Sequence, residues 1–158
     1  IESVKDRIDK LMNAPKPTHS PDYFHKKIGT ILWTACGMSR DEDALKVAIK
    51  SIKELKLDFW ENIKVTGIES DFNQTLEKAG RVADFIELGH LMCIDALDRE
   101  ESCGAHARLE YLAASGDAMR DDENFSYVAA WEYQDTDPTL HKEHLNFEFI
   151  KPTLRDYK

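Results

Sequence analysis

The sequence predicts a mainly α protein: an antiparallel three-helix bundle, spectrin-repeat-like, with a C-terminal extension that contains a β-hairpin. Up to about residue 100, apolar residues recur at helical spacing in long stretches joined by short breaks. After that point the pattern changes to alternation of apolar and polar residues, which is the period of a half-buried strand. We therefore expect a helical bundle over residues 1–100 and an extension over residues 101–158, together in one structural unit.

A short helix and a longer one are expected in the first forty residues. Helical spacing of apolar residues stops where Pro15 and Pro17 exclude a continued helix. Ser20 then offers a side-chain oxygen as N-cap, Pro21 suits the first helical position, and Gly37 ends the second helix. The apolar positions of the two helices are Ile1, Val4, Ile8, Leu11, Phe24, Ile28, Ile31, Leu32 and Ala35.

Two further long helices follow. Ser39 and Glu42 have the spacing of a capping box, and the helix that they begin should continue to about Val65. The last helix should extend over residues 73–100. Because a glycine inside a helix costs about 1 kcal/mol relative to alanine, we expect Gly80 and Gly89 to mark places where another helix packs close.

The hairpin is predicted from two alternating runs, residues 125–133 and 145–150. The connection over residues 134–140 contains Asp135, Asp137 and Pro138, which favour a turn. We expect the two runs to pair as antiparallel strands.

Composition excludes several classes of protein. The formal charge of −9 repels phosphate backbones, and we expect no nucleic-acid partner. No apolar stretch approaches the ~20 residues of a membrane span.

Three unevenly spaced cysteines, Cys36, Cys93 and Cys103, fit free thiols in a reducing compartment, so the expected location is cytoplasmic. The chain begins without Met or a signal-like run, which we interpret as an excised piece of a longer protein.

Two runs, residues 101–108 (Glu-Ser-Cys-Gly-Ala-His-Ala-Arg) and 120–125 (Arg-Asp-Asp-Glu-Asn-Phe), have the period of neither a helix nor a strand. Their order and spacing resemble the C-terminal domain of the flavoprotein subunit of succinate dehydrogenase and fumarate reductase, where Ser-Arg-Gly-Ala-His-x-Arg precedes Arg-Asp-Asp-Glu-Asn-aromatic. The resemblance extends along the whole chain and is nearest to the Bacteroides-type branch. Cys103 stands where most of that family has Arg, so an ionic contact of that Arg is not expected here.

The resemblance implies a three-helix bundle appended to flavin-binding and capping domains. It also implies an oxidoreductase of electron transport and the tricarboxylic acid cycle, in which hydride passes between FAD and the C2–C3 bond of succinate or fumarate. The catalytic and FAD-binding residues of that family lie in the preceding domains. The sequence contains no Gly-x-Gly-x-x-Gly run for a dinucleotide. We expect no catalytic, cofactor-binding or metal-binding residue in this segment.

The resemblance implies instead that the two runs contact the flavin-binding domain of the same chain and an iron-sulfur subunit. Gly104 permits a positive φ or close packing, His106 can donate and accept a hydrogen bond, and Arg108 offers a planar fork for a carboxylate. The alternative is a satisfied loop histidine and a surface arginine. The candidate contact residues are Ser102, Cys103, Gly104, His106, Arg108, Arg120, Asp121, Asp122, Glu123 and Asn124.

Metal chemistry is the less favoured interpretation of these residues. The acids at 121–123 offer oxygen ligands, but capping of a turn and an ion pair to Arg108 or Arg120 fit them better. Cys103 and His106 lack the further ligands of a zinc site, even with Cys93 and the histidines at 141 and 144. A di-iron site needs two Glu-x-x-His pairs, and residues 87–90 supply one.

The expected function is therefore structural support for the flavin domain and contact with the iron-sulfur subunit, in a parent complex peripheral on the inner membrane. The alternative is a free-standing helical module that binds a protein partner. Physiological direction, succinate oxidation or fumarate reduction, does not follow from these residues.

Overall fold

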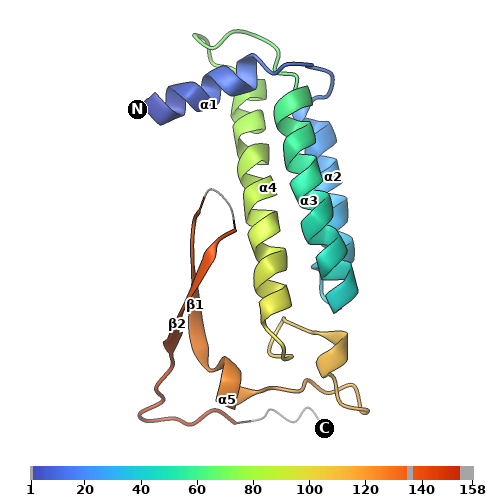
Figure 1. Ribbon diagram of the computed structural model, residues 1–158, viewed down its shortest axis with the longest axis vertical. Helices are drawn as coiled ribbons and strands as arrows, with labels where there is room; N and C mark the ends of the chain where they lie inside the picture. Colours follow the sequence, from blue (N-terminus) through green and yellow to red (C-terminus); the bar gives the residue numbers. More distant parts are fainter. Residues whose placement is uncertain (1, 135–136, 154–158) are drawn as a thin grey trace.

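The computed structural model describes residues 2–134 and 137–153. Helices α2 (Pro21–Ala35), α3 (Glu42–Asn62) and α4 (Gln74–Asp98) lie side by side and alternate in direction, and α1 (Glu2–Met12) crosses one end of them (Figure 1). A 3-10 helix (Leu109–Tyr111) and α5 (Asp122–Phe125) follow, and then the strands β1 (Tyr127–Glu132) and β2 (Thr139–His144). The predicted mainly α class, with a three-helix bundle and a hairpin, is confirmed.

The core lies between the three long helices, where their apolar stripes meet. Phe24 of α2 and Phe59 of α3 are fully buried and pack edge to face with ring centroids 5.1 Å apart. Helix α4 closes the core with Val82, Ile86 and Cys93, which are at most 1 % exposed. On α2 the predicted apolar positions Phe24, Ile28 and Ala35 are buried, so helical periodicity placed the inward face of that helix correctly.

The helix N-termini show which polar residues act as caps. Asp41, not Ser39, is the N-cap of α3, because its carboxylate accepts a hydrogen bond from the Ala44 N–H at 2.8 Å. The capping-box prediction is therefore wrong. Asn73, near which the sequence placed the start of this helix, caps α4 by accepting a 3.0 Å hydrogen bond from the Leu76 N–H. Ser20 occupies the N-cap of α2 but makes no side-chain capping bond.

The two helix glycines have different surroundings. A Cβ at Gly89 would lie 3.0 Å from a Leu32 methyl and 3.2 Å from an Ile28 methyl, so the absent side chain lets α2 approach α4. At Gly80 no atom lies within 4 Å of that position. The prediction of close packing is confirmed for Gly89 and wrong for Gly80, whose carbonyl instead accepts a 2.8 Å hydrogen bond from Arg7 of α1.

These surroundings give opposite expectations for one substitution. Gly80→Ala should raise the free energy of unfolding by up to about 1 kcal/mol, since alanine is the better helix former and space is available. Gly89→Ala should lower it by about 1 kcal/mol, because the new methyl pushes against Leu32 and Ile28. Urea unfolding followed by circular dichroism measures both. Equal effects would show that α2 and α4 do not depend on this close approach.

The hairpin pairs β1 with β2 in the register Tyr127↔His144 to Glu132↔Thr139. The first strand agrees with the sequence pattern. The second was expected over residues 145–150 and lies instead at Thr139–His144, so that prediction is wrong. The alternating apolar residues Leu145, Phe147 and Phe149 follow the strand and are 44–90 % exposed. β2 is exposed along nearly all its length, so burial imposes no apolar alternation on it.

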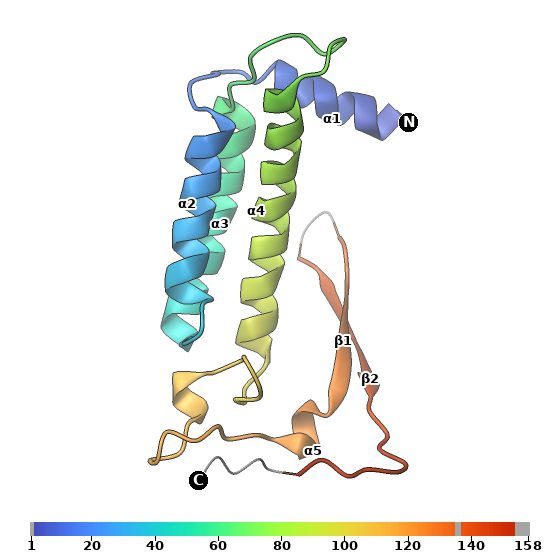
Figure 2. The same cartoon turned by 180° about the vertical axis from the view of Figure 1, so that it is seen from behind.

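The hairpin lies beside the lower half of α4 (Figure 2). Trp131 donates its indole N–H to Asp95 at 2.7 Å, and the Tyr127 hydroxyl lies 3.3 Å from Asp98. Lys142 of β2 places its ammonium 3.6 Å from the same Asp98 carboxylate. The hairpin is thus attached by polar contacts to the lower half of α4.

Candidate contact site at the base of the bundle

Residues 101–125, here called the base segment, pass under the end of the bundle where α2 and α4 finish and α3 begins (Figure 1). Backbone bonds join this segment to the turn before α3: the Arg40 N–H donates to the Ala107 carbonyl at 2.9 Å, and the Leu109 N–H donates to the Arg40 carbonyl at 2.8 Å. Both motifs that the sequence singled out belong to this segment.

Arg108 fixes the base segment to the C-terminal end of α4. Its side chain is 1 % exposed, and Nη1 donates to the carbonyl oxygens of Ala96 at 2.9 Å and Leu97 at 3.2 Å. These carbonyls lie in the last turn of the helix, where they have no intrahelical donor and the helix dipole favours a cation. Arg108 is therefore an internal helix cap, and the alternative of a surface arginine is wrong.

Glu110 links the same arginine to α3. One carboxylate oxygen lies 3.1 Å from Nε of Arg108, and the other accepts a 2.6 Å bond from the Glu42 N–H at the start of α3. Although partial burial acts to raise it, the pKa of Glu110 is lowered by the Glu42 N–H bond and the Arg108 guanidinium. One ion pair thus joins the end of α4 to the beginning of α3.

His106 is held between two arginines. Nη1 of Arg40 lies 2.8 Å from Nδ1, and the Arg99 carbonyl lies 3.0 Å from Nε2. Since a guanidinium can only donate and a carbonyl can only accept, the proton of the neutral imidazole belongs on Nε2. Burial, and secondarily the positive charges of Arg40 and Arg108, lower the pKa of His106 despite the Arg99 carbonyl.

The lowered pKa of His106 predicts a loss of stability in mild acid. Below the ordinary value of 6.5 the unfolded chain takes up a proton that the folded chain resists. The stabilisation is complete above that value and is lost as pH falls through the folded pKa. We expect the urea midpoint to fall between about pH 7 and pH 5, and to fall less in His106→Gln. Equal slopes in the two proteins would contradict this assignment.

Ser102 and Gly104 shape the turn that carries His106. The Ser102 hydroxyl is fully buried, accepts from the Arg108 N–H at 2.9 Å and donates to the Arg108 carbonyl at 3.1 Å. Cys103 and His106 exchange backbone bonds of 2.9 and 3.0 Å around Gly104, whose φ is +60°. The predicted positive φ is confirmed, and this conformation favours glycine.

The second motif also forms a local structure. Asp121 caps α5, accepting from the Asn124 backbone N–H at 3.1 Å and side-chain amide at 2.8 Å, and these bonds lower the pKa of its carboxyl. Arg120 pairs with Asp122 at 2.5 Å. The sequence favoured capping and an ion pair over metal binding for these acids, and the structure shows both. The arginine that pairs with Asp122 is Arg120 and not Arg108.

Glu101 and Arg99 join the two motifs. The Glu101 side chain is 3 % exposed, with one oxygen 2.5 Å from Arg99 and the other accepting from the Asp121 N–H at 2.9 Å. Arg99 also lies against the Phe125 and Tyr127 rings. Sequence reasoning missed Arg40, Arg99 and Glu101 as parts of the site. Glu101 stood at the head of the first motif and was the one signal available.

The site therefore has an inner and an outer side. Ser102 and Arg108 are buried and His106 is half-buried, and all three bind the segment to the bundle. The outward residues of the base segment are exposed to solvent: Cys103, Gly104, Asp122, Glu123 and Asn124. The segment thus presents a largely polar surface that also includes the exposed side chains of Leu109 and Met119.

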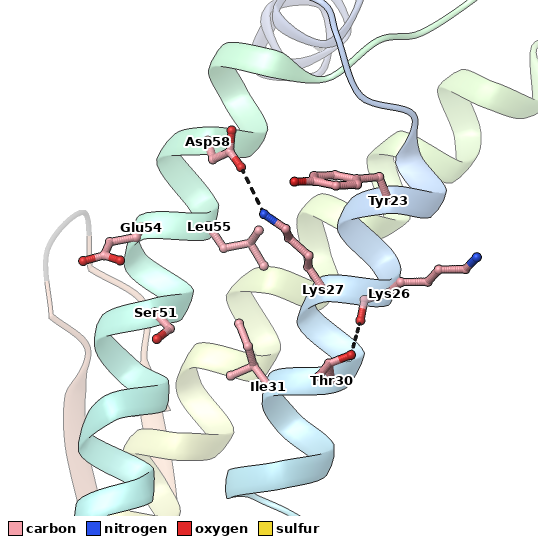
Figure 3. A pocket seen from close by; sticks show the side chains of 9 residues that line it. All are labelled: Tyr23, Lys26, Lys27, Thr30, Ile31, Ser51, Glu54, Leu55 and Asp58. Atoms are coloured by element: carbon pink, nitrogen blue, oxygen red, sulfur yellow. Dashed lines mark hydrogen bonds and ion pairs between the residues drawn. The ribbon is translucent and has the colours of Figure 1, made fainter.

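A separate groove of about 650 Å³ lies between α2 and α3 (Figure 3). Lys27 projects into it, 4.0 Å from Asp58 and over the Tyr23 ring. Thr30 bonds back to the Lys26 carbonyl of its own helix at 3.0 Å. Lys27 and Asp58 face each other across the groove, and we interpret it as a seam between two helices.

Glu87 and His90, the single Glu-x-x-His pair, do not converge. Glu87 pairs with Lys56 at 2.6 Å, and burial followed by the Lys53 charge lowers the pKa of His90. Within residues 2–134 and 137–153, no cluster of three or more His, Cys, Asp or Glu has metal-binding geometry. In the same part of the chain, no helix combines the length and apolar character that crossing a membrane requires.

The family of fumarate reductase flavoprotein C-terminal domains matches residues 25–157, and this chain belongs to that family. The fumarate reductase flavoprotein subunit of Haemophilus influenzae is 26 % identical over 98 % of this chain and 25 % of its own length. That of Helicobacter pylori is 32 % identical over 77 % of this chain and 17 % of its own length. This chain therefore spans about a quarter or less of these relatives.

Solved structures show the same fold. A mutant of E. coli quinol fumarate reductase FrdA superposes with a TM-score of 0.82 and 23 % identity, over 97 % of this chain and 25 % of that one. The family that the two motifs indicated, and the mainly α fold that it implied, are confirmed.

Proposed function

We propose that this chain is the structural and docking domain of a flavoprotein subunit that interconverts succinate and fumarate, with FAD and the catalytic residues in the part of the polypeptide outside these 158 residues. The proposal is supported by membership of the flavoprotein C-terminal family and by relatives named fumarate reductase flavoprotein subunit. The parent complex would lie peripherally on the inner membrane, on its cytoplasmic side.

The observation that carries the docking role is the two-sided base segment. Its inner residues attach it to α4 and α3, whereas Asp122 and Glu123 face outward and are exposed. A polar, charged and already ordered surface suits a separate subunit, because little chain entropy is lost on association. We therefore assign this surface to the iron-sulfur subunit. The buried Ser102 and Arg108 would shape it without touching the partner.

A second face is apolar and suits permanent burial. Helices α2 and α4 line a hollow of about 250 Å³ with Leu32, Phe85, Leu88 and Met92, the last three being 42–55 % exposed. Exposed apolar patches of this kind mark contacts with another part of the same protein or a stable partner. We assign this face to the flavin-carrying part of the same polypeptide.

Charge reversal tests the docking role. In the full-length flavoprotein, Asp122→Lys with Glu123→Lys should reduce recovery of the iron-sulfur subunit in pull-down at least about tenfold, because repulsion replaces complementary contact. The flavin content should not change. The matched control is Glu143→Lys with Glu148→Lys, the same charge change on exposed residues outside the base segment. Wild-type recovery in the first variant would reject the contact role.

The competing function is a free-standing helical interaction module. The reading frame of the gene separates the two: a flavin-binding domain encoded upstream of Ile1 supports the docking domain, and a start codon beside Ile1 supports the module.

A further inference from the structure

Cys36 and Cys93 form a pair of buried thiols between α2 and α4. Cys36, the C-cap of α2, is 6 % exposed and Cys93 is fully buried, and both are free. The Cys36 thiol donates weakly to the carbonyl of Met92, the residue before Cys93, with 3.8 Å between sulfur and oxygen. Neither thiol takes part in the base segment or in the proposed docking.

The close approach at Gly89 explains why the two sulfurs meet. Helices α2 and α4 run in the same direction (Figure 2), and Leu32 of α2 packs directly on Gly89 of α4. Cys36 and Cys93 each lie four residues further along, which is about one helical turn and keeps each on the same face as its predecessor. The two thiols therefore face each other between α2 and α4, one helical turn beyond the contact of Leu32 with Gly89.

The surroundings favour one thiolate at neutral pH. The hydrogen bond from Cys93 lowers the pKa of Cys36 to about 7, against the effect of burial and with a contribution from the Arg40 guanidinium. The pKa of Cys93 is raised, because it shares this hydrogen bond and is buried. A thiolate is the nucleophilic form of cysteine, and here a second thiol stands beside it to resolve an oxidised sulfur.

We propose that Cys36 and Cys93 form a reversible disulfide that ties α2 to α4 when the protein meets a peroxide. The Cys36 thiolate attacks one peroxide oxygen, the O–O bond breaks, and a sulfenic acid and hydroxide form. The Cys93 sulfur then displaces the hydroxyl of that sulfenic acid, and the Cys93 proton and the hydroxyl leave as water. In total two thiols lose two electrons and two protons, and hydrogen peroxide becomes two waters.

Access and reversal are both provided for at this place. Cys36 lies at the C-terminal end of α2 and is 6 % exposed, whereas Cys93 is fully buried, so Cys36 is the thiol that a peroxide meets first. A small dithiol attacking the disulfide by exchange restores both thiols.

Peptide mapping of the full-length flavoprotein tests the disulfide. The folded protein is treated with hydrogen peroxide, free thiols are alkylated, and trypsin releases residues 28–40 and 82–99, which carry the two cysteines. We expect these peptides to appear joined and two hydrogens lighter than their sum, and to separate after dithiothreitol. The joined product should persist in Cys103→Ser, which removes the exposed thiol, and be absent in Cys36→Ser and Cys93→Ser.

The rate of joining gives a second readout that does not depend on the variants. It should rise about tenfold between about pH 6 and pH 8 and then level off, as for a thiol with a pKa of about 7. The proposal is overturned if Cys103 is oxidised while residues 36 and 93 stay alkylated, or if the joined peptide forms only after urea is added.

Discussion

Replacing Arg108 by methionine is expected to lower the free energy of unfolding by about 3 to 5 kcal/mol. The methionine keeps most of the volume but removes the donors to the Ala96 and Leu97 carbonyls and leaves the Glu110 carboxylate without its partner. The two carbonyl oxygens and the carboxylate then lack the hydrogen-bond donor that Arg108 supplied. Water replaces it poorly, because the Arg108 side chain is only 1 % exposed. Urea unfolding followed by circular dichroism at neutral pH measures the change.

The control is the same substitution at Arg120, whose side chain is 23 % exposed and pairs with a carboxylate that is 46 % exposed. Arg120→Met should cost less than about 1 kcal/mol, because solvent screens such pairs. Arg108→Lys should fall between the two, since an ammonium keeps the charge but cannot donate in a fork to the carbonyls and Glu110 together. A loss below about 1 kcal/mol in Arg108→Met would show that α4 does not depend on this cap.

Phe59→Ala should also destabilise the bundle by about 3 to 5 kcal/mol. The Phe59 ring is fully buried and packs edge to face against Phe24 and Trp60 at 5.1 and 5.2 Å. Truncation removes the buried ring and leaves a cavity among three helices. The helices can move only partly to fill that cavity.

Phe72→Ala serves as the matched control, because this ring is 89 % exposed in the connection before α4. Its effect should stay within about 0.5 kcal/mol. Thermal or urea unfolding of both variants tests the assignment of the core. Comparable losses at the two positions would mean that the helices pack with a different register.

The sequence predicted the helices because each long helix buries one continuous face. Within α3, for example, Leu45, Ile52 and Phe59 recur every seven residues, or about two helical turns, because they face one core. The second strand could not be found in this way. Residues 139–144 contain Leu140 as their only purely apolar side chain, and the strand is defined by backbone pairing with β1. Leu145 and Phe147 alternate without belonging to any strand.

The motifs of the base segment were recognisable, but their internal contacts were not. Arg108 was expected to use its fork on a carboxylate, and it meets one in Glu110, yet its deepest contacts are main-chain carbonyls at the end of α4. Those acceptors exist in every sequence and give no signal. Arg40 and His106 lie 66 positions apart and meet only because α3 and α4 return the chain to the same end of the bundle.

Hydrogen–deuterium exchange on the full-length flavoprotein, with and without the iron-sulfur subunit, tests most directly whether the outer surface of residues 101–125 is a docking site. We expect peptides spanning 101–108 and 119–126 to exchange more slowly in the complex, and peptides from β2 to be unchanged. If the peptides spanning 101–108 and 119–126 exchange at the same rate in the free and the assembled protein, the docking role is contradicted.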